Sequence, residues 1–257
     1  MKSWIQVFRS MLSRQWWWST LMVIIGIMVT VYLGFWQLDR LAQRREANHH
    51  TQTMQAASPV NLDNAVPFDD LNTMEYRQVA ATGTYDFKQQ IAIRNQFWTQ
   101  EWGIETGYYL LTPLVLENGR AILVQRGWIP AKYDLHLSWK EFDEPNPASV
   151  EGIIRLPMKE GQMGGGIPDP TIAAGNERQD FWNFVNIEEI QKQIPYPLLG
   201  VYIQQSPNPS LTSYPYRSLP EFDLNDGAHL GYAFQWFFFT SLLIIGYPIF
   251  INKFTEK

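Results

Sequence analysis

The chain has 257 residues, of which 46% are hydrophobic, 15% aromatic and 18% charged. This composition excludes a disordered chain and supplies enough apolar residues for a sizeable core. A net charge of −5 gives none of the basic excess typical of nucleic-acid-binding proteins, so we predict no nucleic-acid partner. The chain has no cysteine, which excludes disulfides, thiolate metal ligands and cysteine nucleophiles.

Two apolar segments, residues 16–38 and 229–251, are long enough to cross a bilayer, which takes about 20 helical residues. Tryptophan and tyrosine residues lie near the ends of both segments, as is typical of membrane interfaces. A cleaved signal peptide is the alternative for the first segment, but the apolar run is too long and no small-residue cleavage site follows it. We therefore predict two membrane-spanning helices in contact with lipid.

Two spans place the tails, residues 1–15 and 252–257, on one side of the membrane and residues 39–228 on the other. Lysine and arginine are slightly more frequent beside the tails than beside the central segment. Because positively charged flanks stay in the cytoplasm, the tails are predicted to be cytoplasmic and the central domain periplasmic.

Between the spans the pattern changes to that of short strands. Six segments rich in β-branched and aromatic residues are bounded by turn residues: 76–86, 89–96, 106–116, 120–129, 149–156 and 198–205. Asn118 and Gly119 predict a tight primed hairpin turn, and Pro113 predicts a sheet edge or a bulge. A helix is predicted at 187–193. We predict a mainly antiparallel β domain, a small barrel or sandwich with one short helix.

A histidine, His229, stands where the second apolar segment begins. With a turn of about 100° per residue, it shares a helical face with Tyr232, Ala233 and Trp236, whereas Phe238 lies on the opposite face. Imidazole is a common axial ligand of haem iron, and Ala233 would leave room for a flat macrocycle against which Trp236 could stack. The alternative is an interfacial histidine that binds headgroups or water.

The first span ends with a comparable pair. Trp36 and Arg40 lie four residues apart and therefore share a helical face. Arg40 can pair with a haem propionate or with an acidic group of a partner. The alternative is that both residues are ordinary anchors at the membrane interface.

Within the predicted β domain the candidate residues are fewer. In "VQRGWIP", Gly127 predicts a bulge, Arg126 is a candidate for partner contact, and Trp128 is either a partner contact or a core aromatic. His136 has Asp134 and Ser138 nearby in sequence, but local clustering does not indicate a catalytic triad, so no catalytic residue is assigned. Residues 160–177 are rich in glycine and proline and predict a long loop.

Three sequence motifs occur in the order that a known protein family has. "YLGFWQLDRLAQR" at the end of the first span, "VQRGWIP" after the hairpin, and "HLGYAFQWF" opening the second span resemble the surfeit locus protein 1 family. The resemblance covers nearly the whole chain. Two departures are Gly227, where the family usually has asparagine, and Phe237 with Phe238, where the family often has glycine.

The resemblance implies an assembly factor for haem-copper cytochrome oxidases, in a bacterial inner membrane and without turnover chemistry. It implies transient contact with haem a, with His229 as the contact and possible iron ligand, and a role in delivering haem a to the main oxidase subunit. The enzyme that makes haem a is a second expected partner. The alternative is a periplasmic binding or hydrolytic domain on inert anchors. Candidate residues cluster at the span ends, at His229, Tyr232, Trp236, Trp36 and Arg40, which favours the assembly factor.

Overall fold

A computed structural model describes residues 4–64, 68–100, 103–158, 169, 178–211 and 213–254. The chain divides into two compact units. We call Met1–His50 with Asp223–Lys257 the helical unit, and Thr51–Phe222 the barrel unit. Apart from Asp169, the predicted loop at 160–177 lies outside the described residues.

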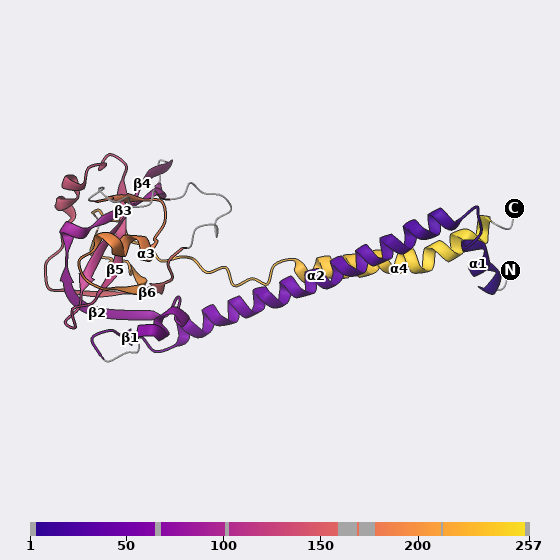
Figure 1. Ribbon diagram of the computed structural model, residues 1–257, viewed down its shortest axis with the longest axis horizontal. Helices are drawn as coiled ribbons and strands as arrows, with labels where there is room; N and C mark the ends of the chain where they lie inside the picture. The colour runs from indigo at the N-terminus through magenta and orange to yellow at the C-terminus, as the bar shows by residue number, and fades with distance from the viewer. Residues whose placement is uncertain are drawn as a thin grey trace. The chain divides into compact units, whose positions relative to one another are not determined.

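The helical unit contains three helices: α1 Trp4–Met11, α2 Trp17–Ala56, of which the last residues belong to the barrel unit, and α4 His229–Phe254 (Figure 1). Both α2 and α4 are long and apolar enough to cross a membrane. The 40 residues of α2 span roughly 60 Å, about twice the thickness of a bilayer's hydrocarbon core. The helix thus continues well past the predicted end of the first span at residue 38.

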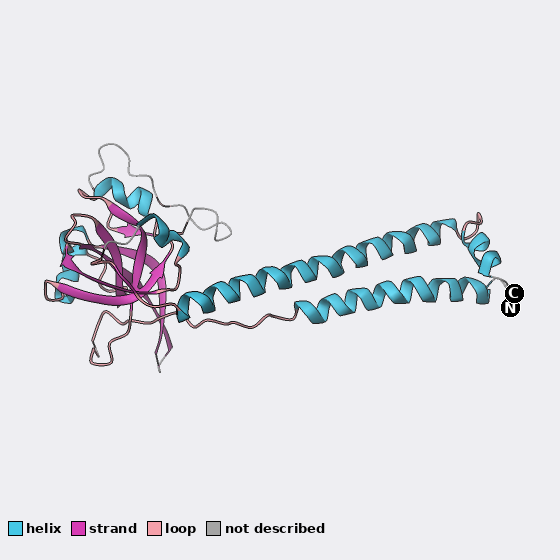
Figure 2. Ribbon diagram, turned by 90° about the horizontal axis from the view of Figure 1, so that it is seen from below, coloured by secondary structure: helices cyan, strands magenta, loops and turns pink. Residues whose placement is uncertain are grey.

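The helices α2 and α4 lie side by side in Figure 2 and pack through small and polar residues. Thr240 and Thr30 are joined by a hydrogen bond of 2.8 Å between their hydroxyls. A Cβ on Gly34 would lie 2.6 Å from the Phe237 ring, so glycine is needed for this close approach. Lipid gives no hydrophobic drive for helix pairing, so close packing and interhelical hydrogen bonds hold such pairs.

Ala233, predicted on the face of His229, is buried, and Phe238, predicted on the opposite face, is exposed. Thr240 is buried with Ala233, and the other exposed side chains of the opposite face are Phe234, Leu242 and Ile245. Tyr232 departs from this division, because it was predicted on the face of Ala233 and is 50% exposed. At the C-terminal end of α4 the Tyr247 hydroxyl lies 2.7 Å from Ser19 Oγ and 2.8 Å from Thr20 Oγ1. This end of the interface with α2 is therefore also joined by hydrogen bonds.

The charged part of α2 binds the segment that leads into α4. Arg44 donates from Nη2 to the Asp223 carbonyl oxygen at 2.7 Å, and Asn48 donates to the Leu224 carbonyl oxygen at 2.8 Å. Arg45 forms an ion pair of 2.8 Å with Asp226. These contacts hold an irregular segment along the helix, where its backbone carbonyls find donors.

The described part of the barrel unit contains eight strands. They are β1 Val60–Asn61, β2 Gln78–Tyr85, β3 Ile91–Gln100, β4 Gly103–Val115, β5 Ala121–Pro130, β6 Ala148–Arg155, β7 Phe181–Trp182 and β8 Leu198–Gln205. The order β2-β6-β8-β5-β4 is closed by pairing of β4 with β2, which makes a five-stranded barrel. The sheet is mixed, because β5 and β8 are parallel while most other pairs are antiparallel. All six predicted strands and the barrel alternative are confirmed.

Short helices cover the barrel. The helix α3 Ile187–Ile190 continues into η4 Gln191–Gln193, which confirms the predicted helix, and three further 3-10 helices are η1 Phe68–Thr73, η2 Phe87–Gln89 and η3 His136–Phe142. One cluster of apolar side chains, including Val124 and Ile203, fills the barrel, and a second packs outside it under α3. Strand β5 lies between these clusters, which explains why every residue of it is buried.

Two local predictions about turns and edges are wrong. Leu116 and Arg120 close a three-residue loop in which Gly119 has a φ of +78° and Asn118 does not have a positive φ, so the turn is not the primed type. Pro113 pairs with Leu123 in β5 and is not on an edge strand. It lies where β4 leaves β3 and joins β2, so its missing N–H interrupts no ladder there.

Candidate functional site at the paired helices

His229 is the first residue of α4, and the backbone before it is held by side chains. Asn225 Oδ1 accepts from the Gly227 backbone N–H at 2.9 Å, and Gly227 adopts a φ of +74°. This left-handed conformation is one that glycine adopts without strain. The departure from the family pattern at Gly227 is therefore compatible with a well-formed helix start.

The side chain of His229 contacts α2 through Gln37. The distance between His229 Nδ1 and Gln37 Oε1 is 2.8 Å, and both side chains are half-buried. A carboxamide oxygen only accepts hydrogen bonds, so Nδ1 carries the proton in this pair. In the neutral imidazole this leaves Nε2 with its lone pair, which is the form that binds metal ions.

The other predicted residues lie to one side of this contact. On antiparallel helices turning by about 100° per residue, Trp36, Arg40 and Tyr232 fall on one side of the Gln37–His229 pair. Trp36 is 40% exposed and Tyr232 50% exposed. The Arg40 guanidinium lies 5.6 Å from the centre of the Trp36 ring, where a cation–π contact is favourable. The structure thus provides an open aromatic and cationic face beside the imidazole.

The opposite side of the contact is closed. Ala233 is only 1% exposed, on the side of Gly34 and Phe237. The expectation that Ala233 leaves room for a macrocycle is therefore wrong, because α2 fills that space. Trp236 is half-buried and packs edge-on against Phe239, with ring centres 6.1 Å apart. Of the two sides of the Gln37–His229 contact, the one with Trp36 and Tyr232 is the exposed one.

Arg126 in the barrel unit lies inside the fold. It is the extra residue of the β4–β5 bulge and is followed by Gly127 with a φ of +139°, which confirms the bulge predicted there. Its side chain is completely buried and donates to Gln90 Oε1 at 2.7 Å and to Glu144 Oε1 at 3.1 Å. Buried charges need such pairing, so this side chain is structural and offers no surface to a partner.

Trp128 is also completely buried. Its backbone N–H donates to the Tyr216 carbonyl oxygen at 2.7 Å, and its ring stacks on that of Tyr216 with centres 6.2 Å apart. Of the two alternatives that the sequence left open, the structure supports the core aromatic. No contact with a partner is available to this side chain.

His136 does not form a catalytic arrangement with its neighbours in sequence. Its Nε2 lies 3.3 Å from Arg178 Nη2, and the Ser138 hydroxyl donates to the Leu135 carbonyl oxygen at 2.5 Å. Among the described residues, no group of three or more His, Asp or Glu side chains could hold a metal ion.

These observations define a membrane-associated β-barrel protein with two long apolar helices and an imidazole where those helices meet. The model of the SURF1 family matches residues 24–241, and the chain belongs to this family. It is 27% identical over 207 residues to Surfeit locus protein 1 of Arabidopsis thaliana, which covers 76% of this chain. A SURF1-like protein of Rickettsia bellii is 25% identical over 243 residues and covers 93% of each chain.

A third relative carries a more specific name. The cytochrome oxidase assembly protein SHY1 of Saccharomyces cerevisiae is 26% identical over 160 residues, or 58% of this chain. The chain spans 53% of the Arabidopsis protein and 40% of the yeast protein.

Proposed function

We propose that this chain is an assembly factor for a haem-copper cytochrome oxidase and assists the delivery of haem a to the main oxidase subunit. Membership of the SURF1 family and the likeness to a yeast cytochrome oxidase assembly protein support this role. The oxidase subunit and the enzyme that makes haem a are the proposed partners, and no turnover chemistry is assigned to the chain. The proposed location is a bacterial inner membrane, with the barrel unit in the periplasm.

The observation that carries the proposal is the hydrogen bond between Gln37 and His229. It leaves His229 Nε2 as a free ligand nitrogen beside the exposed Trp36 and Tyr232. In the proposed complex His229 would hold the haem iron, Tyr232 and Trp36 would contact the macrocycle, with Trp236 further along α4, and Arg40 would pair with a propionate. Bound haem would supply an iron centre that accepts an imidazole nitrogen.

This arrangement favours transient binding. Trp36 and Tyr232, on the open side of the pair, are exposed, so a bound group would remain accessible to another protein. One histidine and a few ring contacts would hold a cargo less firmly than a closed pocket does. Such a site suits transfer between proteins.

The test is the substitution His229→Ala in a host that makes haem a. We expect the purified variant to lose bound haem a, and the membranes to contain less oxidase haem at an unchanged level of the chain. Phe238→Leu is the matched control, because Phe238 is 60% exposed on the opposite face of α4 and should change neither quantity. A His229→Ala protein with its full haem complement and an unchanged absorption spectrum would show that the ligand assignment is wrong.

A further inference from the structure

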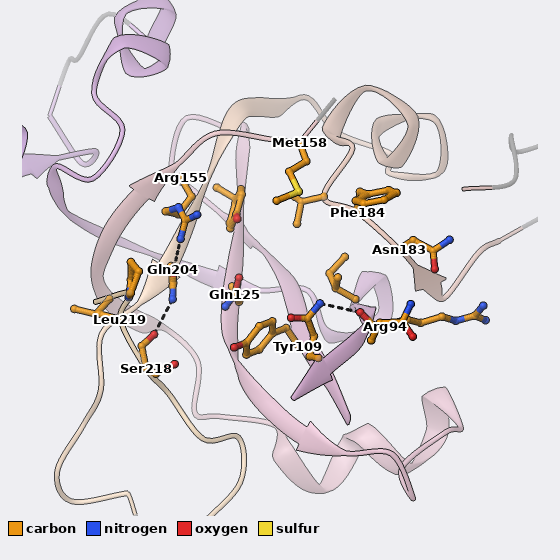
Figure 3. A pocket seen from close by; sticks show the side chains of 16 residues that line it. Arg94, Tyr109, Gln125, Arg155, Met158, Asn183, Phe184, Gln204, Ser218 and Leu219 are labelled. Atoms are coloured by element: carbon orange, nitrogen blue, oxygen red, sulfur yellow. Dashed lines mark hydrogen bonds between the residues drawn. The ribbon is translucent and has the colours of Figure 1, made fainter. Parts of the chain in front are cut away.

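A cavity of about 560 Å³ opens on the outer face of the barrel (Figure 3). Tyr109 from β4, Gln125 from β5 and Gln204 from β8 line its floor. Their neighbours Val124 and Ile203 point into the barrel, so the floor residues point outward. The volume is in the range of sites that bind small molecules, about 300–1,000 Å³.

A strand irregularity forms one edge of the cavity. The pairing of β3 with β4 shifts register between Ile93 and Gln96, and Asn95 has a φ of +59°. Strand β3 pairs with β7 only at Ala92 and Ile93, after which Arg94 to Gln96 line the cavity. Bulges of this kind are frequent beside binding sites, where they redirect side chains.

The floor contains a buried carboxamide without a protein partner. Gln125 is 9% exposed, and its side chain makes no hydrogen bond with any described residue. In Figure 3 it lies between Gln204 and Tyr109. The Gln125 amide atoms are not among the buried side-chain atoms that lack a partner, so they are reached from the open cavity and are available to a molecule there.

One wall carries a guanidinium with unused donors. Arg155 donates from Nη1 to Gln204 Oε1 at 2.6 Å, and Gln204 donates in turn to the Ser218 carbonyl oxygen at 2.7 Å. The Arg155 Nε atom is buried and forms an ion pair of 3.6 Å with Glu75 Oε1, too long for a hydrogen bond. Of the five N–H groups on an arginine side chain, those on Nη2 make no hydrogen bond with a described residue and can bind a ligand.

The charged side chains that line the cavity are two arginines, Arg94 and Arg155, and the lining includes no aspartate or glutamate. Glu75, outside the lining, forms an ion pair of 3.6 Å with Arg155 Nε. Burial raises the pKa of Tyr109 above its ordinary value, so this phenol stays neutral and can donate a hydrogen bond. Met158, Phe184 and Leu219 add apolar surface. The cavity thus combines a cation and amide groups with an apolar wall.

We propose that this cavity is a binding site for a small amphipathic carboxylate. Arg155 and the Gln125 carboxamide donate to the carboxylate group, while Met158 and Phe184 contact the apolar body. A carboxylate pairs with arginine through charge-assisted hydrogen bonds, which are the stronger kind. The site lies within the barrel unit and requires neither haem nor His229, so it is independent of the assembly role.

The probe is para-trifluoromethylbenzoate, added to the full-length chain in lipid nanodiscs and followed by fluorine NMR. We expect saturable binding of this carboxylate. The neutral benzamide and the cationic benzylamine with the same trifluoromethyl group should bind about tenfold more weakly or worse, because neither can form a charge-assisted pair with Arg155. Absence of saturable binding, or equal binding of the benzylamine, would overturn the proposal.

The decisive variant is Gln125→Leu. Because the Gln125 carboxamide has no partner among the described residues, its removal should leave the melting temperature of the free protein equal or higher, while the probe binds about tenfold more weakly. The matched control is Gln205→Leu on β8, which removes another buried glutamine that does not line this cavity and should keep wild-type affinity. Equal affinity of Gln125→Leu and wild type would refute the assigned contact and the site with it.

Discussion

At the scale of single residues, Gln37 determines how His229 can act. Imidazole has two nitrogens, and the hydrogen bond from Nδ1 to Gln37 Oε1 fixes the proton on one of them. Gln37 is next to Trp36 in the sequence, but nothing in the sequence marks it as a site residue. Its contact with His229 becomes visible only when the two helices are paired.

Replacing Gln37 with leucine should weaken haem binding without removing the ligand. In Gln37→Leu the imidazole loses its fixed orientation and tautomer, and loss of such an outer partner weakens metal binding about tenfold or more. Gln37→Glu should retain binding and lower the reduction potential of the bound haem, because a carboxylate makes the imidazole a stronger donor. Haem titration followed by absorption spectroscopy, with a redox titration, measures both. Wild-type haem affinity in Gln37→Leu would show that Gln37 does not contribute to the site.

His136 gives the barrel unit a pH-dependent contribution to stability. Burial lowers its pKa from the ordinary value of 6.5; Asp180 and Asp143 oppose this shift, whereas Arg178 adds to it. The unfolded chain therefore takes up a proton at a higher pH than the folded chain does. The contribution of His136 is fully present above about pH 6.5 and is lost as the pH falls toward the folded pKa.

The substitution His136→Gln isolates this effect. We expect the difference in unfolding free energy between pH 7.5 and about pH 5.5 to be smaller in His136→Gln than in wild type. The free energies are measured by urea unfolding, followed by a spectroscopic signal of the barrel unit. Asp143 has its pKa raised by burial from 3.8, so its own contribution changes in a lower pH range. Identical pH profiles for the two proteins would argue against a perturbed His136.

At the scale of elements, α2 and α4 are held by residues that are small or carry one hydroxyl. Thr30 with Thr240 and Ser19 with Tyr247 join the helices directly. The sequence showed which face of α4 is apolar but not its partner, because contacts about 200 residues apart leave no periodic signal. The need for glycine at position 34 in particular is explained only by the Phe237 ring that packs against it.

Cysteine pairs can test this register, since the chain has no native cysteine. Thr30→Cys with Thr240→Cys should form a disulfide on mild oxidation, because the two hydroxyls are 2.8 Å apart. Adding Gly34→Leu should lower the yield severalfold by pushing Phe237 away. Thr30→Cys with Leu242→Cys is the control, because Leu242 is 52% exposed on the other face of α4. Mass spectrometry of the linked peptides reads the result, and equal yields from the two pairs would contradict the packing.

At the scale of the whole molecule, the two candidate spans lead to a prediction of topology. A reporter active only in the periplasm should be active when fused after Gln100 in a chain truncated there, and silent when fused at Lys257. The reason is that two spans return the C-terminus to the side of the N-terminus. The reverse pattern would place the barrel unit in the cytoplasm and exclude the proposed location.

Much of the fold could be predicted from the sequence, and the failures have physical causes. The six longer strands carry β-branched and aromatic runs, whereas β1 and β7 have two residues each and no pattern to detect. The continuation of α2 to Ala56 was missed because residues 39–56 are polar and have no apolar stripe. Arg126 was misjudged because its partners Gln90 and Glu144 lie 36 and 18 residues away in sequence.

The position of β8 in the barrel has a consequence for the order of folding. Strand β8 lies between β5 and β6, both of which precede it in the chain. Until residues 198–205 have been synthesised, β5 and β6 each keep an unpaired edge, and such edges promote aggregation. Barrel closure must then wait until almost the whole segment before α4 has been made, and pairing across such sequence separations is slow. A ribosome that pauses between β6 and β8 would hold an open sheet with unpaired, aggregation-prone edges. The yield of folded protein should therefore depend on the rate of translation.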